Sequence, residues 1–247
     1  MLAYDKIKNN HGKIMMKKNE LTTALEEMPE LQVFEASKLY NQIFNHEMSE
    51  AAYYKALERL TKEGCLAKIS KGLYCRPKKT KYGIVLPSEQ SIVSEYIKGN
   101  SGVVVGYSLY NALHLSTQIA KNINIYSNAI NQRIKTVGNI QIERSSLEFN
   151  EEIRRAVEFL EVLRNFYAIQ DLNYNSFIRY CSQYVKTYKE SVIEIILENM
   201  NYSKSTIAFL RNILSYYGIN NSLSKYLSAL STYKYPEMEQ IYELARI

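Results

Sequence analysis

The chain has 247 residues, of which 46% are hydrophobic and 23% are charged, an ordinary composition for a folded protein. No apolar run approaches the roughly eighteen residues of a membrane-spanning helix, and the polar segment 1–12 lacks the apolar core of a secretory signal. Its three cysteines, Cys65, Cys75 and Cys181, are widely spaced and odd in number, which argues against a disulfide framework. We therefore expect a cytoplasmic protein.

The net charge of +6 is concentrated in one short segment. Between Thr61 and Lys81 seven basic residues accompany a single acid, Glu63, so the rest of the chain is close to neutral. Clustered positive charge is what a phosphate backbone attracts, whereas net charge alone is weak evidence for a nucleic-acid partner. The plain alternative is a solvated surface. The seven basic residues are Lys62, Lys68, Lys71, Arg76, Lys78, Lys79 and Lys81.

The first part of the chain is predicted to be helical. Segments 4–10, 18–28 and 35–44 carry apolar residues at helical spacing, and Pro29 follows the second of them. The clearest helix follows Ser49, whose side chain is a good N-cap, and continues to about residue 63, where Gly64 ends it. Its core face is predicted to carry Tyr53, Leu57 and Leu60 together with Ala56.

A basic β-hairpin is predicted directly after this helix. Strands at 66–70 and 73–76 flank Lys71-Gly72, where glycine supplies the positive φ of a tight turn, and Pro77 ends the second strand. Helices followed by a basic hairpin are typical of a winged helix-turn-helix, in which the capped helix enters the major groove and the hairpin reaches phosphates. A helix–hairpin unit that only completes a core is the alternative. Segment 78–82 is interpreted as a basic connector.

This arrangement predicts two groups of DNA-contacting residues. Residues on the exposed side of the first two turns of the capped helix would contact base edges, since lysine donates to guanine, glutamate accepts from cytosine and alanine touches a thymine methyl. Basic residues of the helix and hairpin, with the capping serine, would bind phosphate. For the lysine of the first group, a solvated side chain is the alternative. The first group is Glu50, Ala51, Tyr54 and Lys55, and the second is Ser49, Arg59, Lys68, Lys71 and Arg76.

The remainder is predicted as an α/β part over residues 83–147 and a helical part over 148–247, with a domain boundary after residue 82. Helices are expected at 88–98 and 106–115, and strands at 123–126, 133–137 and 140–144, the last two joined by Gly138-Asn139. From about residue 150 only helices are expected, on apolar stripes beginning at Ile153, Phe177 and Ile207, the second continuing to Ile196. The predicted fold class is α+β.

Motifs for catalysis, metals or cofactors are not found. The three histidines lie far apart, and Cys65 and Cys75 have no second pair at zinc-ligand spacing. Gly99, Gly102 and Gly106 fit neither phosphate-loop pattern, so a plain loop is the better interpretation. We expect a binding protein without cofactor or metal, and not an enzyme.

A series of short motifs resembles a known family in its order and spacing. Through them the chain resembles the AbiEi family of antitoxins from type IV toxin–antitoxin systems, over roughly residues 33–234. About twenty residues between Gly12 and Val33 depart from the family pattern. The motifs are Val33-Phe34, Ala56-Leu57-x-Arg59-Leu60, Gly64-Cys65-Leu66, Lys71-Gly72-Leu73-Tyr74, Tyr82-Gly83, Leu86-Pro87, Gly106-Tyr107-Ser108, Ala112-Leu113-His114-Leu115-Ser116-Thr117-Gln118, Ile207-Ala208-Phe209-Leu210 and Leu227-Ser228-Ala229-Leu230.

The resemblance implies a winged helix that binds operator DNA and represses its own operon, and a C-terminal domain that counters a nucleotidyltransferase-like toxin. Direct binding of the toxin is not implied, and both a monomer and a homodimer are compatible with it. One alternative is a winged-helix transcription factor whose second half binds a small ligand or dimerises, with no toxin partner. Two others are an enzyme whose site is scattered through the C-terminal half, and a protein-interaction module with a vestigial winged helix.

Overall fold

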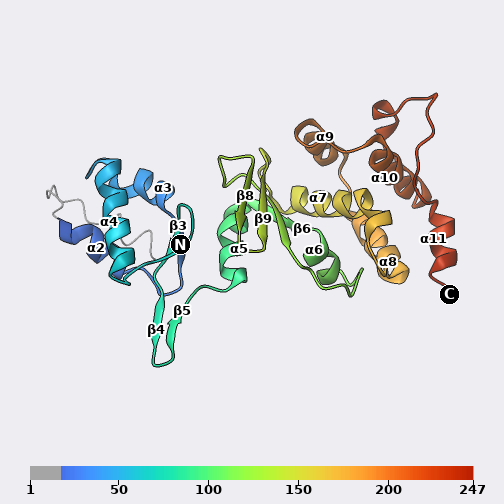
Figure 1. Ribbon diagram of the computed structural model, residues 1–247. Helices are drawn as coiled ribbons and strands as arrows, with labels where there is room; N and C mark the ends of the chain where they lie inside the picture. Colours follow the sequence, from blue (N-terminus) through green and yellow to red (C-terminus); the bar gives the residue numbers. More distant parts are fainter. Residues whose placement is uncertain (1–17, 247) are drawn as a thin grey trace. The chain divides into compact units, whose positions relative to one another are not determined.

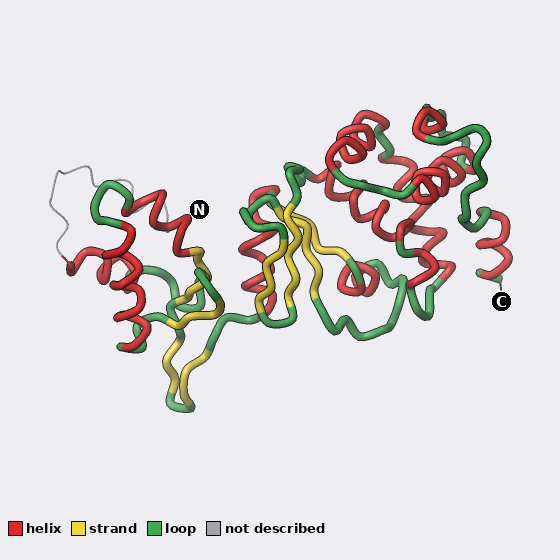
Figure 2. The backbone as a smooth tube through the Cα atoms, turned by 45° about the horizontal axis from the view of Figure 1, so that its top comes forward, coloured by secondary structure: helices red, strands yellow, loops and turns green. Residues whose placement is uncertain are grey.

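The computed structural model of the protein describes residues 18–246, so the helix expected at 4–10 lies outside the described residues. It is a mixed α+β structure with several small sheets (Figures 1 and 2). The chain divides into two compact units, Met1–Glu95 and Tyr96–Ile247, and helix α5 (Glu89–Ile97) contains the division. Within the described residues, no helix combines the length and the apolar character needed to cross a membrane.

Three helical segments form most of the first unit. They are α2 (Lys18–Glu26), α3 (Ala36–Leu39), which continues as a π-helical turn over Tyr40–Phe44, and α4 (Glu50–Lys62). Their apolar faces meet in one core, in which Phe34, Leu57 and Leu60 are almost completely buried. The helices predicted at 18–28, 35–44 and 50–63 are thus confirmed, with small shifts at their ends.

A three-stranded antiparallel sheet, in the order β1-β3-β2, completes this unit. Strands β2 (Ala67–Ser70) and β3 (Leu73–Cys75) form the predicted hairpin, and Gly72 at its turn has the expected positive φ of 75°. Strand β1 (Val33–Glu35) pairs with β3, so that Val33 lies opposite Cys75. The sequence did not indicate β1, because its partner lies about forty residues further along the chain.

The segment interpreted as a basic connector forms a second hairpin, and that prediction was wrong. Strand β4 (Lys78–Thr80) pairs with β5 (Gly83–Val85), and the hairpin projects away from the rest of the unit (Figure 1). All six strand residues are exposed. The usual indication of a strand, alternation between buried and exposed positions, is therefore absent from this segment.

The second unit contains a four-stranded sheet in the order β6-β7-β9-β8. Strands β8 (Ile134–Val137) and β9 (Ile140–Arg144) form the hairpin predicted around Gly138, whose φ is 59°. Strand β9 pairs in parallel with β7 (Ile123–Ser127), whereas β6 (Gly102–Val105) pairs with β7 in antiparallel. Strand β6 was not predicted, since it falls among the glycines interpreted as a loop.

The rest of the second unit is helical, as predicted. Helix α6 (Tyr107–Ala112) lies within the sheet region, and α7 (Glu151–Arg164), α8 (Tyr174–Tyr184), α9 (Glu190–Asn199), α10 (Lys204–Tyr216) and α11 (Met238–Leu244) follow it. The stripe predicted to continue from Phe177 to Ile196 is broken, because a 3₁₀ turn over Val185–Thr187 separates α8 from α9. A large core joins these helices to β6.

Candidate nucleic-acid interface

The N-terminal turns of α4 present a short exposed surface. The hydroxyl of Ser49 accepts a hydrogen bond from the Ala52 amide at 3.3 Å, which confirms the predicted cap. Glu50, Ala51 and Lys55 are exposed, while Tyr53 on the opposite face is buried. Three of the four predicted base-contacting residues therefore lie where an incoming ligand can reach them.

Tyr54 and Arg59 are less free than the helical pattern predicts. Tyr54 is half-buried, with its ring edge-on to the Tyr53 ring at 5.4 Å, and burial followed by the charge of Glu50 raises the pKa of its hydroxyl. Arg59 is half-buried and lies 3.7 Å from the Glu63 carboxylate. Both side chains flank the exposed strip of α4 and do not occupy its centre.

The β2–β3 hairpin carries two of the predicted phosphate ligands. Lys68 and Lys71 are exposed. The pKa of Glu58 on α4 is lowered chiefly by its hydrogen bond and ion pair with Lys62, and further by the charges of Lys55 and Lys68. Because such an effect falls off with distance, the charge of Lys68 lies near Glu58 in the C-terminal half of α4.

Arg76 has a structural contact that the sequence did not indicate. Its Nη1 atom donates a hydrogen bond of 2.8 Å to the carbonyl oxygen of Met28, and its own carbonyl oxygen accepts from the Leu31 amide at 2.7 Å. These contacts join the end of β3 to the segment before β1. The half-buried Arg76 guanidinium is consequently less available for phosphate than the two lysines.

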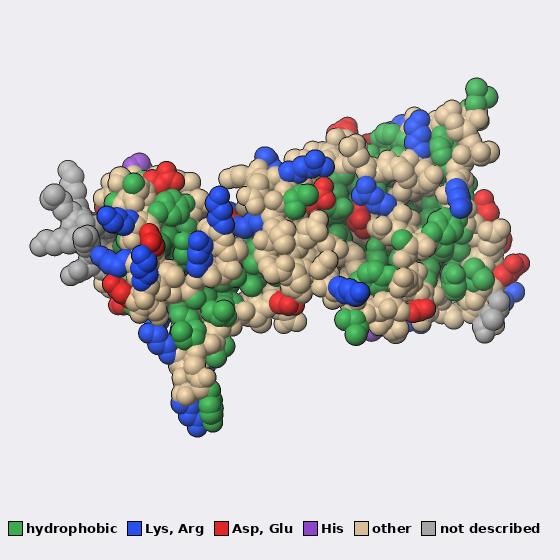
Figure 3. Space-filling model, viewed as in Figure 1, with side chains coloured by type: hydrophobic (Ala, Val, Ile, Leu, Met, Phe, Trp, Pro, Cys, Tyr) green, Lys and Arg blue, Asp and Glu red, His purple; other side chains and the backbone are tan. Residues whose placement is uncertain are grey.

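A positively charged and acid-free stretch runs through both hairpins. No Asp or Glu occurs between Glu63 and Glu89, and six basic residues lie between them. Its five lysines are exposed, and none of them forms an ion pair within residues 18–246. Figure 3 shows basic and hydrophobic side chains together at the end of the projecting hairpin. The five are Lys68, Lys71, Lys78, Lys79 and Lys81.

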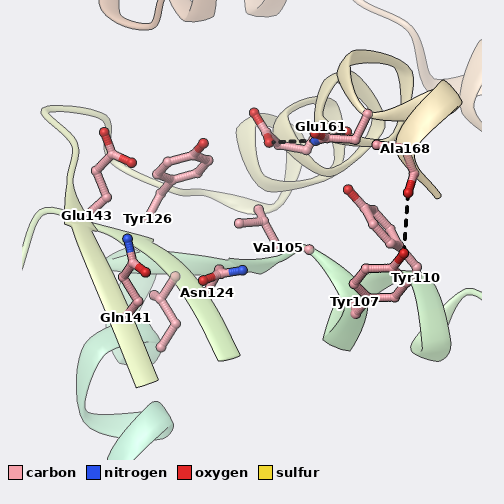
Figure 4. Close-up of a pocket in the computed structure, with 12 residues that line it drawn as sticks. Val105, Tyr107, Tyr110, Asn124, Tyr126, Gln141, Glu143, Glu161 and Ala168 are labelled. Atoms are coloured by element: carbon pink, nitrogen blue, oxygen red, sulfur yellow. Dashed lines mark hydrogen bonds between the residues drawn. The ribbon is translucent and has the colours of Figure 1, made fainter. Parts of the chain in front are cut away.

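The second unit holds a separate polar cleft of about 390 Å³ (Figure 4). Its floor is one face of the β7–β9 pair, where Asn124 lies opposite Gln141 and Tyr126 opposite Glu143. On these strands, isoleucines occupy the alternate positions, and Ile125 among them also contributes to the lining of the cleft. This alternation was the available sign of a polar site, and the sequence-based predictions missed it.

A buried carboxylate lies on the helical side of this cleft. Glu161 of α7 is 4% exposed, forms an ion pair with Arg164 at 3.2 Å and accepts a hydrogen bond from the Asn165 side chain. Burial, and then the charge of Glu161, raises the pKa values of the Tyr110 and Tyr126 hydroxyls well above their usual value. At neutral pH these hydroxyls are protonated and can donate hydrogen bonds into the cleft.

No group of three or more His, Cys, Asp or Glu residues with the arrangement of a metal site occurs in the part of the chain that the structure describes. The cysteines are free; burial raises the pKa of Cys75 to about 11 and also raises that of Cys181. Buried thiols with raised pKa values are poor metal ligands and poor nucleophiles, because both roles require the thiolate.

Comparison with known proteins gives a family match and a distant structural similarity. A family model described as a family of unknown function (DUF6088) matches residues 33–152, just under half of the chain. No curated protein matches the chain. A crystal structure of the RV2827C protein from Mycobacterium tuberculosis is similar with 11% sequence identity and a TM-score of 0.38, over 86% of this chain and 81% of that one.

Proposed function

We propose that the protein is a DNA-binding regulator whose first unit is a winged helix-turn-helix. In this proposal α4 is the recognition helix and the β2–β3 hairpin is the wing. The single observation that carries it is a capped helix with an exposed N-terminal strip, followed in the chain by an acid-free hairpin with the exposed lysines Lys68 and Lys71. A recognition helix with adjacent phosphate-binding cations is what major-groove recognition requires.

We further propose that this regulator is the antitoxin of a type IV toxin–antitoxin system, on the strength of its resemblance to the AbiEi family. It would repress its own operon through the winged helix and counter a nucleotidyltransferase-like toxin through the second unit, without a stable complex being required. The protein would act by binding and not by catalysis. Loss of protection against the co-encoded toxin, when residues 96–247 are deleted, is the genetic test.

The polar cleft favours a second candidate, a winged-helix regulator with a ligand-binding second unit and no toxin partner. Clefts of about 300–1,000 Å³ with a few convergent polar groups are typical of small-molecule sites, and this one has the size and the lining. A gene for a nucleotidyltransferase-like protein next to this one would favour the antitoxin. A small molecule that alters operator binding would favour the second candidate.

The first experiment compares binding to the protein's own upstream promoter with binding to scrambled DNA of equal length, across a range of salt concentrations. We expect selective binding that weakens steeply with salt. Lys71→Ala should weaken binding to both DNAs and lower the salt slope by about one unit, whereas Lys55→Ala should cost about 1–3 kcal/mol on the promoter alone. Equal and weak binding to both DNAs would refute the proposal.

A further inference from the structure

The β4–β5 hairpin is a projecting arm with a narrow tip. A two-residue turn, Lys81-Tyr82, joins the strands, and Lys79 lies opposite Ile84. The hydroxyl of Thr80 donates to the Gly83 carbonyl at 3.0 Å and accepts from the Tyr82 amide at 3.2 Å. Gly83, with φ of 123°, has no side chain to widen the tip.

The arm exposes apolar side chains that a binding partner could cover. Four apolar residues are largely exposed: Tyr82 at 88%, Ile84 at 61%, Leu86 at 53% and Val85 at 42%. An isolated two-stranded hairpin is marginally stable in water, and exposed apolar patches commonly mark interaction sites. The arm therefore presents a contact surface that the first unit does not cover.

The charge of the arm matches nucleic acid. Lys78, Lys79 and Lys81 are exposed, and the eight strand and turn positions of the hairpin contain no acid. The Lys81 ammonium lies 4.9 Å from the centre of the Tyr82 ring. Three-residue strands rise about 3.4 Å per residue, so the arm is about 10 Å long. That length exceeds the depth of the minor groove, about 7.5 Å, while only a narrow tip fits its width of about 6 Å.

We propose that the β4–β5 hairpin is a second DNA-contacting arm, which binds phosphates with Lys78, Lys79 and Lys81 and inserts Tyr82 at its tip into the minor groove. This inference rests on the proposed function, and it assigns a contact beyond α4 and the β2–β3 wing. The arm follows β3 after only Arg76 and Pro77, so it continues the acid-free basic stretch of the chain that begins at Lys68.

The test measures the salt dependence of promoter binding for two triple variants that lose the same charge. Each phosphate contact contributes about 0.9 to the slope of log affinity against log salt. We expect Lys78→Ala/Lys79→Ala/Lys81→Ala to lower the slope by about 2.7. The control, Lys121→Ala/Lys186→Ala/Lys204→Ala, removes three exposed lysines of the second unit and should leave the slope unchanged.

The tip is tested separately with Tyr82→Ala. We expect weaker binding with an unchanged salt slope, since the side chain carries no charge. Circular dichroism should report a wild-type fold for every variant, because all the substituted residues are exposed.

The outcomes separate this inference from the proposed function. If the hairpin triple variant retains the wild-type slope while Lys71→Ala lowers it, the winged helix stands and the second arm is refuted. A hairpin that serves a protein partner would give that result. If the wild-type protein binds promoter and scrambled DNA equally, but the hairpin variant still lowers the slope, the arm stands as a non-specific contact and the regulator is refuted. If the wild-type protein binds neither DNA, both fail.

Discussion

At the scale of single residues, Glu158 on α7 is a carboxyl group in an unfavourable environment. Burial raises its pKa to about 7, and the charges of Arg154 and Arg155 oppose the shift only in part. Burial, and then the charge of Glu158, raises the pKa of Tyr180 on helix α8. Because the pKa is higher in the folded state than in the unfolded chain, the folded state binds the proton more tightly.

We predict that this group lowers stability as the pH rises. Below the unfolded-state pKa of about 4.5, Glu158 is protonated in both states and does not lower the free energy of unfolding. Between pH 4.5 and about 7 the free energy of unfolding falls, because the unfolded chain has released the proton that the folded state still binds. Above pH 7 Glu158 is ionised in both states, and the free energy of unfolding stays lowered by the full amount. Glu158→Gln should therefore raise the free energy of unfolding at pH 8 by about 3 kcal/mol and leave it nearly unchanged at pH 4. Urea unfolding at the two pH values measures this, and an equal effect at both would contradict it.

At the scale of elements, the N-cap of α4 makes a predictable contribution to the stability of the helix. Ser49→Ala removes the side-chain acceptor for the Ala52 amide, and such substitutions cost about 1 kcal/mol. We expect faster amide hydrogen exchange in the first turn of α4 and weaker promoter binding. Ser203→Ala, which removes the corresponding cap of α10, is the control and should change exchange in α10 alone. Unchanged exchange in the Ser49 variant would mean that the cap does not stabilise the helix.

Elements specified by neighbouring residues could be predicted from the sequence. The ends of α4 follow from Ser49 and Gly64, and the β8–β9 hairpin follows from Gly138, since each signal acts within a few residues. Strand β1 could not be predicted in this way, because Val33 becomes a strand only by pairing with distant Cys75. The β4–β5 hairpin is equally hidden, because none of its strand residues is buried.

The candidate interface could also be predicted only in part. Exposure of Glu50, Ala51 and Lys55 follows from the helical period alone. The contact between Arg76 and the Met28 carbonyl depends on how the chain before β1 returns to the end of β3, which no local pattern specifies. Charge can be read directly from a sequence, whereas the availability of a charged side chain requires the fold.

At the scale of the whole molecule, the chain has two separate hydrophobic cores, one in each unit. Leu57 is fully buried in the first and Phe209 is 2% exposed in the second. Cavity-forming substitutions in such positions cost about 2–5 kcal/mol.

We predict that each substitution destabilises only the unit that contains it. Leu57→Ala should speed amide exchange across residues 18–95 and leave the protection of residues 96–246 near its wild-type level, while Phe209→Ala should do the reverse. Exchange followed by mass spectrometry can compare the two variants. Loss of protection throughout the chain in either variant would show that the units unfold as one.

The order of the strands in the second sheet has a consequence for the route by which the protein folds. Strands β8 and β9 are neighbours in the chain and pair around a two-residue turn, so their hairpin can form within microseconds. Strand β9 then joins β7 in parallel, and β7 also pairs with β6 about twenty residues earlier. We therefore expect the parallel pairing of β9 with β7 to be the slow step of folding. Substitutions at Ile125 and Ile142, which lie opposite each other in this pairing, should change the folding rate most.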